Sequence, residues 1–359
     1  MRFFEKVDEI WTSAETRFGR GTVAILTGIL FVVVAGLMCT PRFTPEHHGL
    51  GLTRLYIHPF DFSTEEDLRF RILSPLLGYL LFFRGVCFKY FMLIVLAIFY
   101  GVLYHGQRKN ELRPSEAIGL TSLMAFSTLS FYQFYFPAYN DPTSFLLIAL
   151  CLFYFRQQWL KLILPCLLLF NHENNIFLFP FFWLLFLDGN YRFSNLVRQG
   201  FGLLLSIIPY LIYRQWVLSH QTVEYDVAYY IDPKNVQWTR EHVLPNLVSG
   251  IFQAFKLSWL IPAIAVYVDF KEKRFGEIAL IVTGFVFVLS QMLVAYDISR
   301  LMGMCFPILI IAALRIRSHF GSEKFLFAVT ALVLLNFFIP TYCIGALDPI
   351  PLPPFWMGW

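Results

Sequence analysis

Long runs of apolar residues, separated by short polar stretches, recur along the whole chain of 359 residues. A helix needs about 20 apolar residues to cross the ~30 Å hydrocarbon core of a bilayer, so such runs are the main sequence signal for membrane helices. We predict an all-α, polytopic transmembrane fold that forms one integral membrane domain over 1–359. The pattern predicts about eleven segments, at 21–39, once within 72–104, and at 117–136, 143–155, 160–170, 176–187, 201–217, 247–268, 278–295, 301–314 and 325–341.

The composition supports a membrane protein. The chain is 57% hydrophobic, 19% aromatic and 14% charged, with a mean hydropathy of +0.60, whereas soluble domains are about 25% charged. These values exclude a cytosolic enzyme, a nucleic-acid-binding protein and a small disulfide-stabilised domain. None of the Asn residues begins an Asn-x-Ser/Thr sequon, which favours a bacterial inner membrane over a membrane of the secretory pathway.

The net charge of +4 becomes informative once each loop is assigned to one side of the membrane. Cytoplasmic loops retain Lys and Arg, and loops on the same side as the N-terminus hold 17 of the 28 basic residues. We therefore predict a cytoplasmic N-terminus and an extracytoplasmic C-terminus. The other side collects 13 of the 24 acids and six of the eight His, so the side chains able to bind ligands gather on the outer face.

The stretch 160–187 allows two interpretations. One long helix with a polar centre would move every later loop to the other side of the membrane. A hairpin of two short helices, joined by Asn171-His172-Glu173-Asn174-Asn175, keeps the basic loops together and fits better. Eleven or twelve residues at ~1.5 Å each reach halfway through the core, so we expect the joining motif to line a cavity below the outer surface.

Five further segments complete the predicted organisation. The stretch 72–104 should cross once, with part of it along the interface. Residues 1–20 form a cytoplasmic segment that can fold as an amphipathic helix, with Val7, Ile10, Trp11 and Ala14 on one face. The extracytoplasmic parts are a first loop at 40–71 with a short helix, a loop at 218–246 and a tail at 342–359.

The first outer loop carries one candidate group of site residues. Ser63 and Glu66 have the spacing of a capping box, which predicts a short helix that carries Arg71 toward the membrane surface. Asp61 precedes this helix in a loop of Pro and aromatic residues. The acids at 65–67 and Arg69 also fit a solvated helix face, whereas Asp61 and Arg71 lie next to apolar structure.

Three more polar motifs fall at predicted outer helix junctions. Tyr139-Asn140-Asp141-Pro142 also fits a plain helix start, because Asp can cap a helix and Pro suits its first turn. His172 and Glu173 lie at membrane depth, where ionisable groups are functional candidates by default, although they can also pair with each other or cap the hairpin. Asp297 and Arg300, which follow Tyr296, are three residues apart and can pair on one helical turn.

Together these motifs indicate a chemistry. Carboxylates accept protons or bind divalent cations, His donates to a developing anion, and Arg grips phosphate with two hydrogen bonds. This set suits a phosphate-bearing substrate that arrives from the membrane and meets a polar substrate from outside.

The motifs also resemble those of a known group. An N-terminal helix, an acidic first outer loop and further acid or His motifs at outer junctions are similar to the GT-C superfamily of membrane glycosyltransferases. The short elements that carry the resemblance are Phe60-Asp61, Arg71-Ile72-Leu73-Ser74-Pro75, Asn140-Asp141-Pro142, His172-Glu173 and Asp297-Ile298-Ser299-Arg300. The resemblance covers the architecture of most of the chain, and none of the motifs is diagnostic.

The resemblance implies a function and a site. Such enzymes move a sugar from a polyprenyl-phosphate carrier to an extracytoplasmic glycan or protein acceptor. Asp61 would be the general base, and Arg71 and Arg300 would stabilise the lipid-phosphate leaving group. Asp141, His172 and Glu173 would position the sugar or a divalent metal, for which Asp61, Asp141 and Glu173 are the candidate ligands. Asp297 completes the catalytic set, and the substrate-binding candidates are His58, Glu66, Arg69, Tyr139, Asn140, Asn171 and Tyr296.

One departure from the family pattern leaves the base open. Many members carry a paired acidic motif in the first loop, whereas Phe62 follows Asp61 here and the nearest acids are Glu65 and Glu66. The base is therefore one of these three residues. Two other functions remain as alternatives. One is a polymerase or ligase of lipid-linked glycans. The other is a transporter or flippase for a lipid-linked or anionic substrate, since transporters also place polar residues on broken helices.

Overall fold

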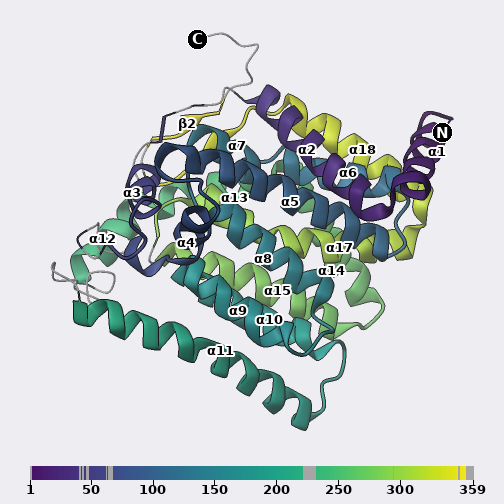
Figure 1. Cartoon of the computed structure of the whole chain (residues 1–359). Helices are drawn as coiled ribbons and strands as arrows, with labels where there is room; N and C mark the ends of the chain where they lie inside the picture. Colours follow the sequence, from purple (N-terminus) through teal and green to yellow (C-terminus); the bar gives the residue numbers. More distant parts are fainter. Residues whose placement is uncertain are drawn as a thin grey trace.

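The computed structural model describes residues 2–39, 42, 44–45, 48–61, 63, 68–220, 232–293, 295–346 and 348–352 of the chain. This part is almost entirely helical (Figure 1), which confirms the predicted all-α class. Its only strands are β1 (Tyr342–Cys343) and β2 (Ile350–Pro351), which pair antiparallel within the described residues.

The helices follow one another with short connections. The first half contains α1 (Arg2–Phe18), α2 (Arg20–Met38), α3 (His48–Leu55), the 3-10 turn η1 (Leu68–Phe70), α4 (Leu73–Leu80), η2 (Gly85–Cys87), α5 (Phe88–Lys109), α6 (Pro114–Ala125), α7 (Thr128–Tyr135), α8 (Asp141–Tyr154) and α9 (Leu160–Asn171). The second half contains η3 (Glu173–Leu178), α10 (Phe179–Leu187), α11 (Phe193–His220), α12 (Pro233–His242), η5 (Leu244–Asn246), α13 (Leu247–Phe255), η6 (Lys256–Trp259), α14 (Leu260–Lys271), α15 (Phe275–Ser290), η7 (Gln291–Leu293), α16 (Ile298–Met302), η8 (Gly303–Cys305), α17 (Phe306–Phe320) and α18 (Ser322–Phe338).

Six helical stretches in the described residues are long and apolar enough to cross a membrane. They are Arg20–Met38, Gly85–Lys109, Phe193–His220, Val236–Lys271, Phe275–Leu293 and Ile298–Phe320. The other five expected segments form shorter helices, and the one at 117–136 is divided between α6 and α7. The structure thus supports a helical membrane protein, while the eleven crossings stay a prediction.

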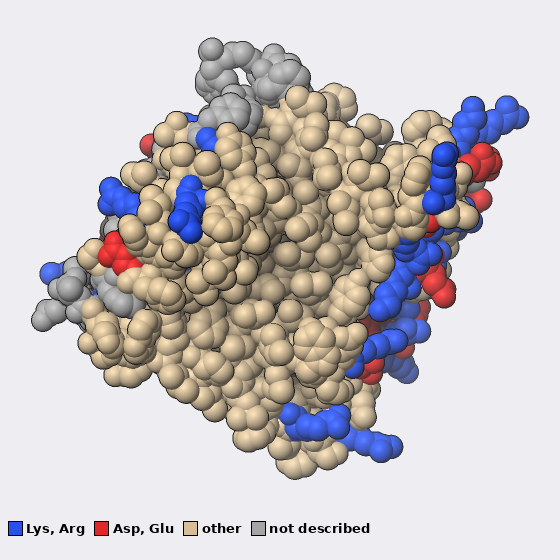
Figure 2. Space-filling view, in the orientation of Figure 1, with Lys and Arg blue, Asp and Glu red and all other residues tan. Residues whose placement is uncertain are grey.

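Charged side chains gather at two opposite ends of the molecule, with an apolar band between them on the face shown in Figure 2. Large apolar side chains are also exposed on the long helices, such as Ile25 of α2, Leu204 of α11 and Val286 of α15. We call the two ends the α1 end and the α3 end, after the helices that mark them in Figure 1. Large exposed apolar surfaces of this kind are expected where lipid covers the protein.

Ion pairs between distant segments hold the α1 end together. Arg108 at the end of α5 bonds Glu15 of α1 at 2.7 Å, and His319 at the end of α17 lies 2.7 Å from Glu272, which follows α14. Burial raises the pKa of Glu15, but hydrogen bonds from Arg108 and Tyr104 outweigh it and leave the pKa below its usual value. These segments are the ones that the charge pattern assigns to a common side.

The stretch 160–187 folds as the predicted hairpin. η3 separates α9 from α10. The start of α9 and the end of α10 lie together at the α1 end, where Arg156 lies 3.7 Å from Asp188. Lys161 near the start of α9 also donates to the carbonyl oxygen of Phe186 near the end of α10, at 2.9 Å. The joining motif at 171–175 therefore lies away from the α1 end.

Two further segments refine the sequence predictions. Within 72–104, the eight residues of α4 are too short to cross, and the chain turns at Phe82 and Gly85, both with positive φ, before α5. The predicted amphipathic helix is α1, but Ile10 does not share the inner face with Trp11. Trp11 and Ala14 pack against the core, whereas Ile10 faces outward.

Two glycines allow α2 and α5 to pack backbone to backbone. A Cβ atom at Gly28 would overlap the carbonyl oxygen of Ala97, and one at Gly101 would lie 2.9 Å from that of Ala24. Small residues commonly permit such close approach between membrane helices. The pairing of α2 with α5 therefore depends on the absence of a side chain at these positions.

Gly28→Ala should push α2 away from α5 and destabilise the protein, because overpacking a tight interface costs about 1–3 kcal/mol. Gly21→Ala is the matched control on the same helix, since a Cβ there meets no atom within 4 Å. We expect thermal unfolding in detergent to show a midpoint several degrees lower for Gly28→Ala and an unchanged or higher midpoint for Gly21→Ala. Equal midpoints would contradict the close packing.

Candidate functional site

Arg300, near the start of α16, is the centre of a buried ion cluster at the α3 end. Its Nε donates to Oδ2 of Asp141 at 2.9 Å, and its Nη1 donates to Oδ2 of Asp297 at 2.6 Å. Asp141 is 1% exposed, whereas the Asp297 side chain is 39% exposed. The cluster thus has one carboxylate inside the protein and one that solvent reaches.

The cluster confirms one sequence prediction and contradicts another. The pairing of Asp297 with Arg300 at a spacing of three residues is confirmed. The interpretation of Asp141 as a helix cap is wrong, because α8 shows no side-chain hydrogen bond at its cap and the Asp141 carboxylate turns to Arg300 instead. Arg300 is 159 residues away in sequence, and the buried guanidinium provides a stronger, charge-assisted hydrogen bond than a backbone N–H.

Arg71 and Glu173 form a second ion pair. Arg71 follows η1 and Glu173 opens η3, and the guanidinium grips the carboxylate through Nε at 3.2 Å and Nη2 at 2.8 Å. Arg71 is buried, while the Glu173 side chain is 24% exposed. The structure thus places Arg71 inside the protein with its charge paired, and its position near the membrane surface stays a prediction.

His172 has a mainly structural contact. Its Nδ1 accepts a hydrogen bond from the backbone N–H of Asn174 at 3.2 Å and so caps η3. The same nitrogen lies 3.7 Å from Oε2 of Glu173. The interpretation of His172 as a cap is confirmed, and Arg71 is the closer partner of Glu173.

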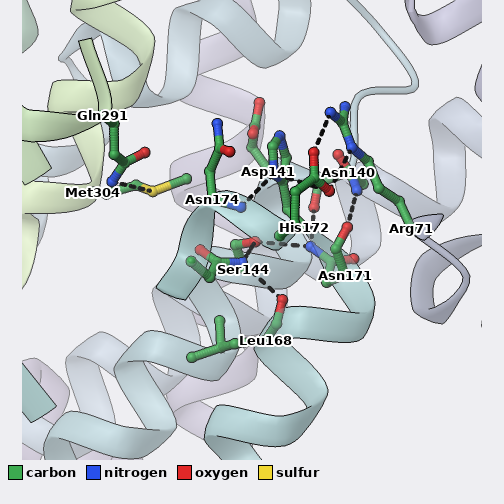
Figure 3. A network of polar contacts seen from close by, with 12 residues as sticks. Arg71, Asn140, Asp141, Ser144, Leu168, Asn171, His172, Asn174, Gln291 and Met304 are labelled. Carbon is green, nitrogen blue, oxygen red and sulfur yellow. Dashed lines mark hydrogen bonds and ion pairs between the residues drawn. The ribbon is translucent and has the colours of Figure 1, made fainter. Parts of the chain in front are cut away.

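Asparagine side chains join the chain next to Asp141 to the motif at 171–175 (Figure 3). Nδ2 of Asn171 donates to the carbonyl oxygen of Asn140 at 2.9 Å and to the hydroxyl of Ser144 at 2.8 Å, and Asn140 in turn donates to the carbonyl oxygen of Asn171. Because Asn140 precedes Asp141 and Asn171 lies two residues before Glu173, this exchange fixes the two carboxylates relative to each other. Such satisfied, buried networks are rigid.

A group of arginines lies beside the second pair, at the end of α11. The guanidinium of Arg214 lies 4.4 Å from the centre of the Phe70 ring, and that of Arg69 lies 5.8 Å from the same ring. The hydroxyl of Tyr213 donates to the carbonyl oxygen of Arg69 at 2.9 Å. The charges of Arg71 and Arg214 both act on Glu173. We call Arg69, Arg71 and Arg214 the arginine group.

Arg214 is the member that the sequence patterns miss. It lies inside the predicted apolar segment 201–217, and the four motifs at helix junctions do not include it. An arginine within an apolar segment is itself a signal, since placing a charge at membrane depth costs about 2.5–3.5 kcal/mol. Arg214 belongs to α11, and only the tertiary fold places it beside Phe70 of η1.

Asp61 lies on a loop that packs against α11, the helix that carries Arg214. Its Oδ1 accepts hydrogen bonds from the hydroxyl of Ser63 at 2.6 Å and from the Ser63 backbone N–H at 2.9 Å, and these bonds lower the pKa of Asp61. The preceding Phe60 packs edge-on against Trp216 of α11, with 6.1 Å between ring centres. The loop of Asp61 is thereby held against the end of α11, two residues from Arg214.

The remaining predicted residues fall into three groups. Tyr139 is buried, with the Arg300 guanidinium 4.9 Å from its ring centre, and Tyr296 packs against Trp238 of α12 at 4.6 Å. His58 lies exposed on the loop of Asp61. Glu65 and Glu66, and with them the predicted helix start, lie outside the described residues, and Ser63 uses its hydroxyl to bond Asp61.

The predicted metal ligands are not brought together. The described part of the chain holds no group of three or more His, Cys, Asp or Glu side chains that could bind a metal ion. Asp141 and Glu173 each face an arginine, and Asp61 lies on a separate loop. These three carboxylates therefore do not form one metal site in this structure.

Comparisons with protein-family models, with curated proteins and with solved structures gave no match for this chain.

Asp141→Asn should destabilise the protein by about 3–5 kcal/mol, because removing one partner of a buried ion pair leaves the charge of Arg300 poorly compensated. Asp297→Asn is the matched control, since its side chain is 39% exposed and exposed pairs contribute at most about 1 kcal/mol. Denaturation in detergent should also show that the double variant Asp141→Leu/Arg300→Met recovers much of the loss. Equal effects of the two Asn variants would contradict the buried cluster.

Proposed function

We propose that the chain is a membrane glycosyltransferase of the GT-C type, which moves a sugar from a polyprenyl-phosphate carrier to a glycan or protein acceptor outside the cell. The observation that carries this proposal is the convergence of Arg69, Arg71 and Arg214 on Glu173 and Phe70, at one end of α11. α11 is the least buried of the six long helices. A carrier lipid in the bilayer can therefore reach this end of the protein sideways.

The proposed topology places the α3 end outside. The N-terminus and the basic loops of the α1 end are cytoplasmic, as the positive charges of these loops favour, and the short helices add to the six long ones to give about eleven crossings in a bacterial inner membrane. The asparagine network and both ion pairs then lie below the outer surface, where a lipid-borne substrate and a water-borne substrate can meet.

The arginine group suits the phosphate of the carrier. Guanidinium groups bind phosphate with two parallel hydrogen bonds and remain charged at every physiological pH. Glu173 holds Arg71 through two hydrogen bonds and Phe70 supports Arg214 from one face, so these donors are oriented before the substrate arrives. The isoprenoid tail follows the outward-facing apolar side chains of α11, such as Leu204 and Leu211.

The transfer itself needs a base and a stabilised leaving group. The oxygen of the acceptor hydroxyl attacks C1 of the sugar, the bond from C1 to the phosphate oxygen breaks, and polyprenyl phosphate leaves with the electron pair. Asp61 takes the hydroxyl proton, and its lowered pKa keeps it ionised at neutral pH. Asp297, which is held by Arg300 and partly exposed, positions sugar hydroxyl groups.

A transporter remains the second candidate, and one observation favours it. His172 and Glu173 lie at a break between two short helices, α9 and α10, as substrate sites of transporters often do. Accumulation of substrate in sealed vesicles without a covalent product would support transport, whereas release of polyprenyl phosphate by purified protein supports transfer. A polymerase or ligase of lipid-linked glycans would release a pyrophosphate carrier instead.

Arg214→Met should lower kcat/KM for the lipid-linked donor about tenfold or more, because a hydrogen bond to a charged group contributes about 1.5–3 kcal/mol. Arg240→Met on α12 is the matched control, since this arginine is exposed and lies outside the arginine group. The measurement is release of polyprenyl phosphate by the purified protein. Unchanged turnover in Arg214→Met would place the phosphate elsewhere.

Asp61→Asn should abolish release while expression and thermal stability stay unchanged. Because the pKa of Asp61 is lowered, the wild-type rate should not fall with decreasing pH until below the ordinary aspartate value of about 3.9. Asp232→Asn is a close control, since Asp232 is exposed and, like Asp61, accepts the backbone N–H two residues ahead, here that of Lys234. Full activity in Asp61→Asn would remove Asp61 from the mechanism.

A further inference from the structure

Helix α1 is held against the protein by one face. Asp8, Trp11 and Glu15 are three and four residues apart, so they share this face. Oδ1 of Asp8 accepts the backbone N–H of Ser115 at 2.8 Å, Trp11 donates to the hydroxyl of Thr27 at 3.3 Å, and Glu15 bonds Arg108. The docked face of α1 thus carries acids and an aromatic ring, all with partners in the protein.

A second face of α1 is apolar and uncovered. Phe3 is 71% exposed and Ile10 is 61% exposed. Lys6 and Arg17 share the side of the helix that carries Phe3 and Ile10, because spacings of three, four and seven residues return to one face. Both bases are exposed. Two large apolar side chains that alternate with two basic ones along the helix form an amphipathic edge, which we call the Phe3 edge.

The charges of α1 are sorted between its faces. Glu5, Asp8 and Glu9 line a groove of about 450 Å³ between α1 and the turn that follows α5, opposite Arg108 and Arg113. Glu15 is likewise turned to Arg108. All four acids of the helix therefore face the groove or the docked side, and Lys6 and Arg17 remain on the Phe3 edge. Basic side chains project from this end of the molecule in Figure 2.

The chain geometry places the Phe3 edge at the level of a membrane boundary. α1 ends at Phe18, and the membrane helix α2 begins at Arg20. Gly19 between them has φ 82°, in the left-handed region that favours glycine, and so turns the chain between the two helices. Ile25 and Leu26, one turn into α2, point outward into the apolar band.

We propose that the Phe3 edge binds an anionic phospholipid surface. Phe3 and Ile10 enter the boundary between headgroups and acyl chains, and Lys6 and Arg17 contact lipid phosphates. Helices with an apolar face flanked by Lys and Arg lie in the membrane interface in this way, and anionic lipids strengthen their binding. Separation of the acids onto the groove side removes the repulsion that they would meet at such a surface. The proposal does not depend on the enzymatic function.

The test uses the full-length protein in nanodiscs, with a spin label at Ile10→Cys or, as the matched control, at Thr12→Cys, an exposed polar position that lines the groove on the side of α1 away from Ile10. Both are made with Cys87→Ser, because Cys87 is the exposed native cysteine among the described residues. In discs with about one third phosphatidylglycerol, we expect the Ile10 label to be several-fold less accessible to a water-soluble nickel relaxant than the Thr12 label.

Lipid charge and protein charge are then varied separately. The protection of the Ile10 label should fall in discs of phosphatidylcholine alone, and it should fall equally in phosphatidylglycerol discs when Lys6→Gln and Arg17→Gln are introduced. Equal accessibility of the two labels in phosphatidylglycerol discs would overturn the proposal. Protection that does not change with lipid charge would overturn the role of anionic headgroups.

Discussion

A charged group inside a membrane protein must find a partner, and the α3 end of this molecule is organised around that constraint. Arg71 and Arg300 are both buried, and each is hydrogen-bonded to a carboxylate. The partners come from distant parts of the chain, so each pair fastens one segment to another. The reciprocal hydrogen bonds between Asn140 and Asn171 then join the two pairs into one network.

This network also distinguishes the α3 end from the α1 end. Ion pairs at the α1 end, such as Arg108 with Glu15, connect turns and dock α1. At the α3 end, buried arginines are paired with partly exposed carboxylates, as Arg71 is with Glu173. An arginine held by such a pair can offer its remaining N–H groups to an anion, which is what a phosphate-bearing lipid requires.

The sequence predicted local features and missed those that depend on the tertiary fold. The all-α class, the hairpin at 160–187 and the pairing of Asp297 with Arg300 follow from hydrophobic pattern and from spacing within one helical turn. The pairing of Arg300 with Asp141 spans 159 residues, and no local pattern reveals it. Asp141 fits a helix cap equally well until its real partner is known, and Arg214 is hidden by the apolar residues around it.

The account rests on the claim that the arginine group receives the phosphate of a membrane lipid. The most direct measurement is an experimental structure of the protein in nanodiscs with a short-chain polyprenyl phosphate. We expect density for the phosphate within hydrogen-bonding distance of Arg71 and Arg214, with the isoprenoid tail along α11. Phosphate density at a different place, with Arg71 and Arg214 in contact with protein groups alone, would contradict the account.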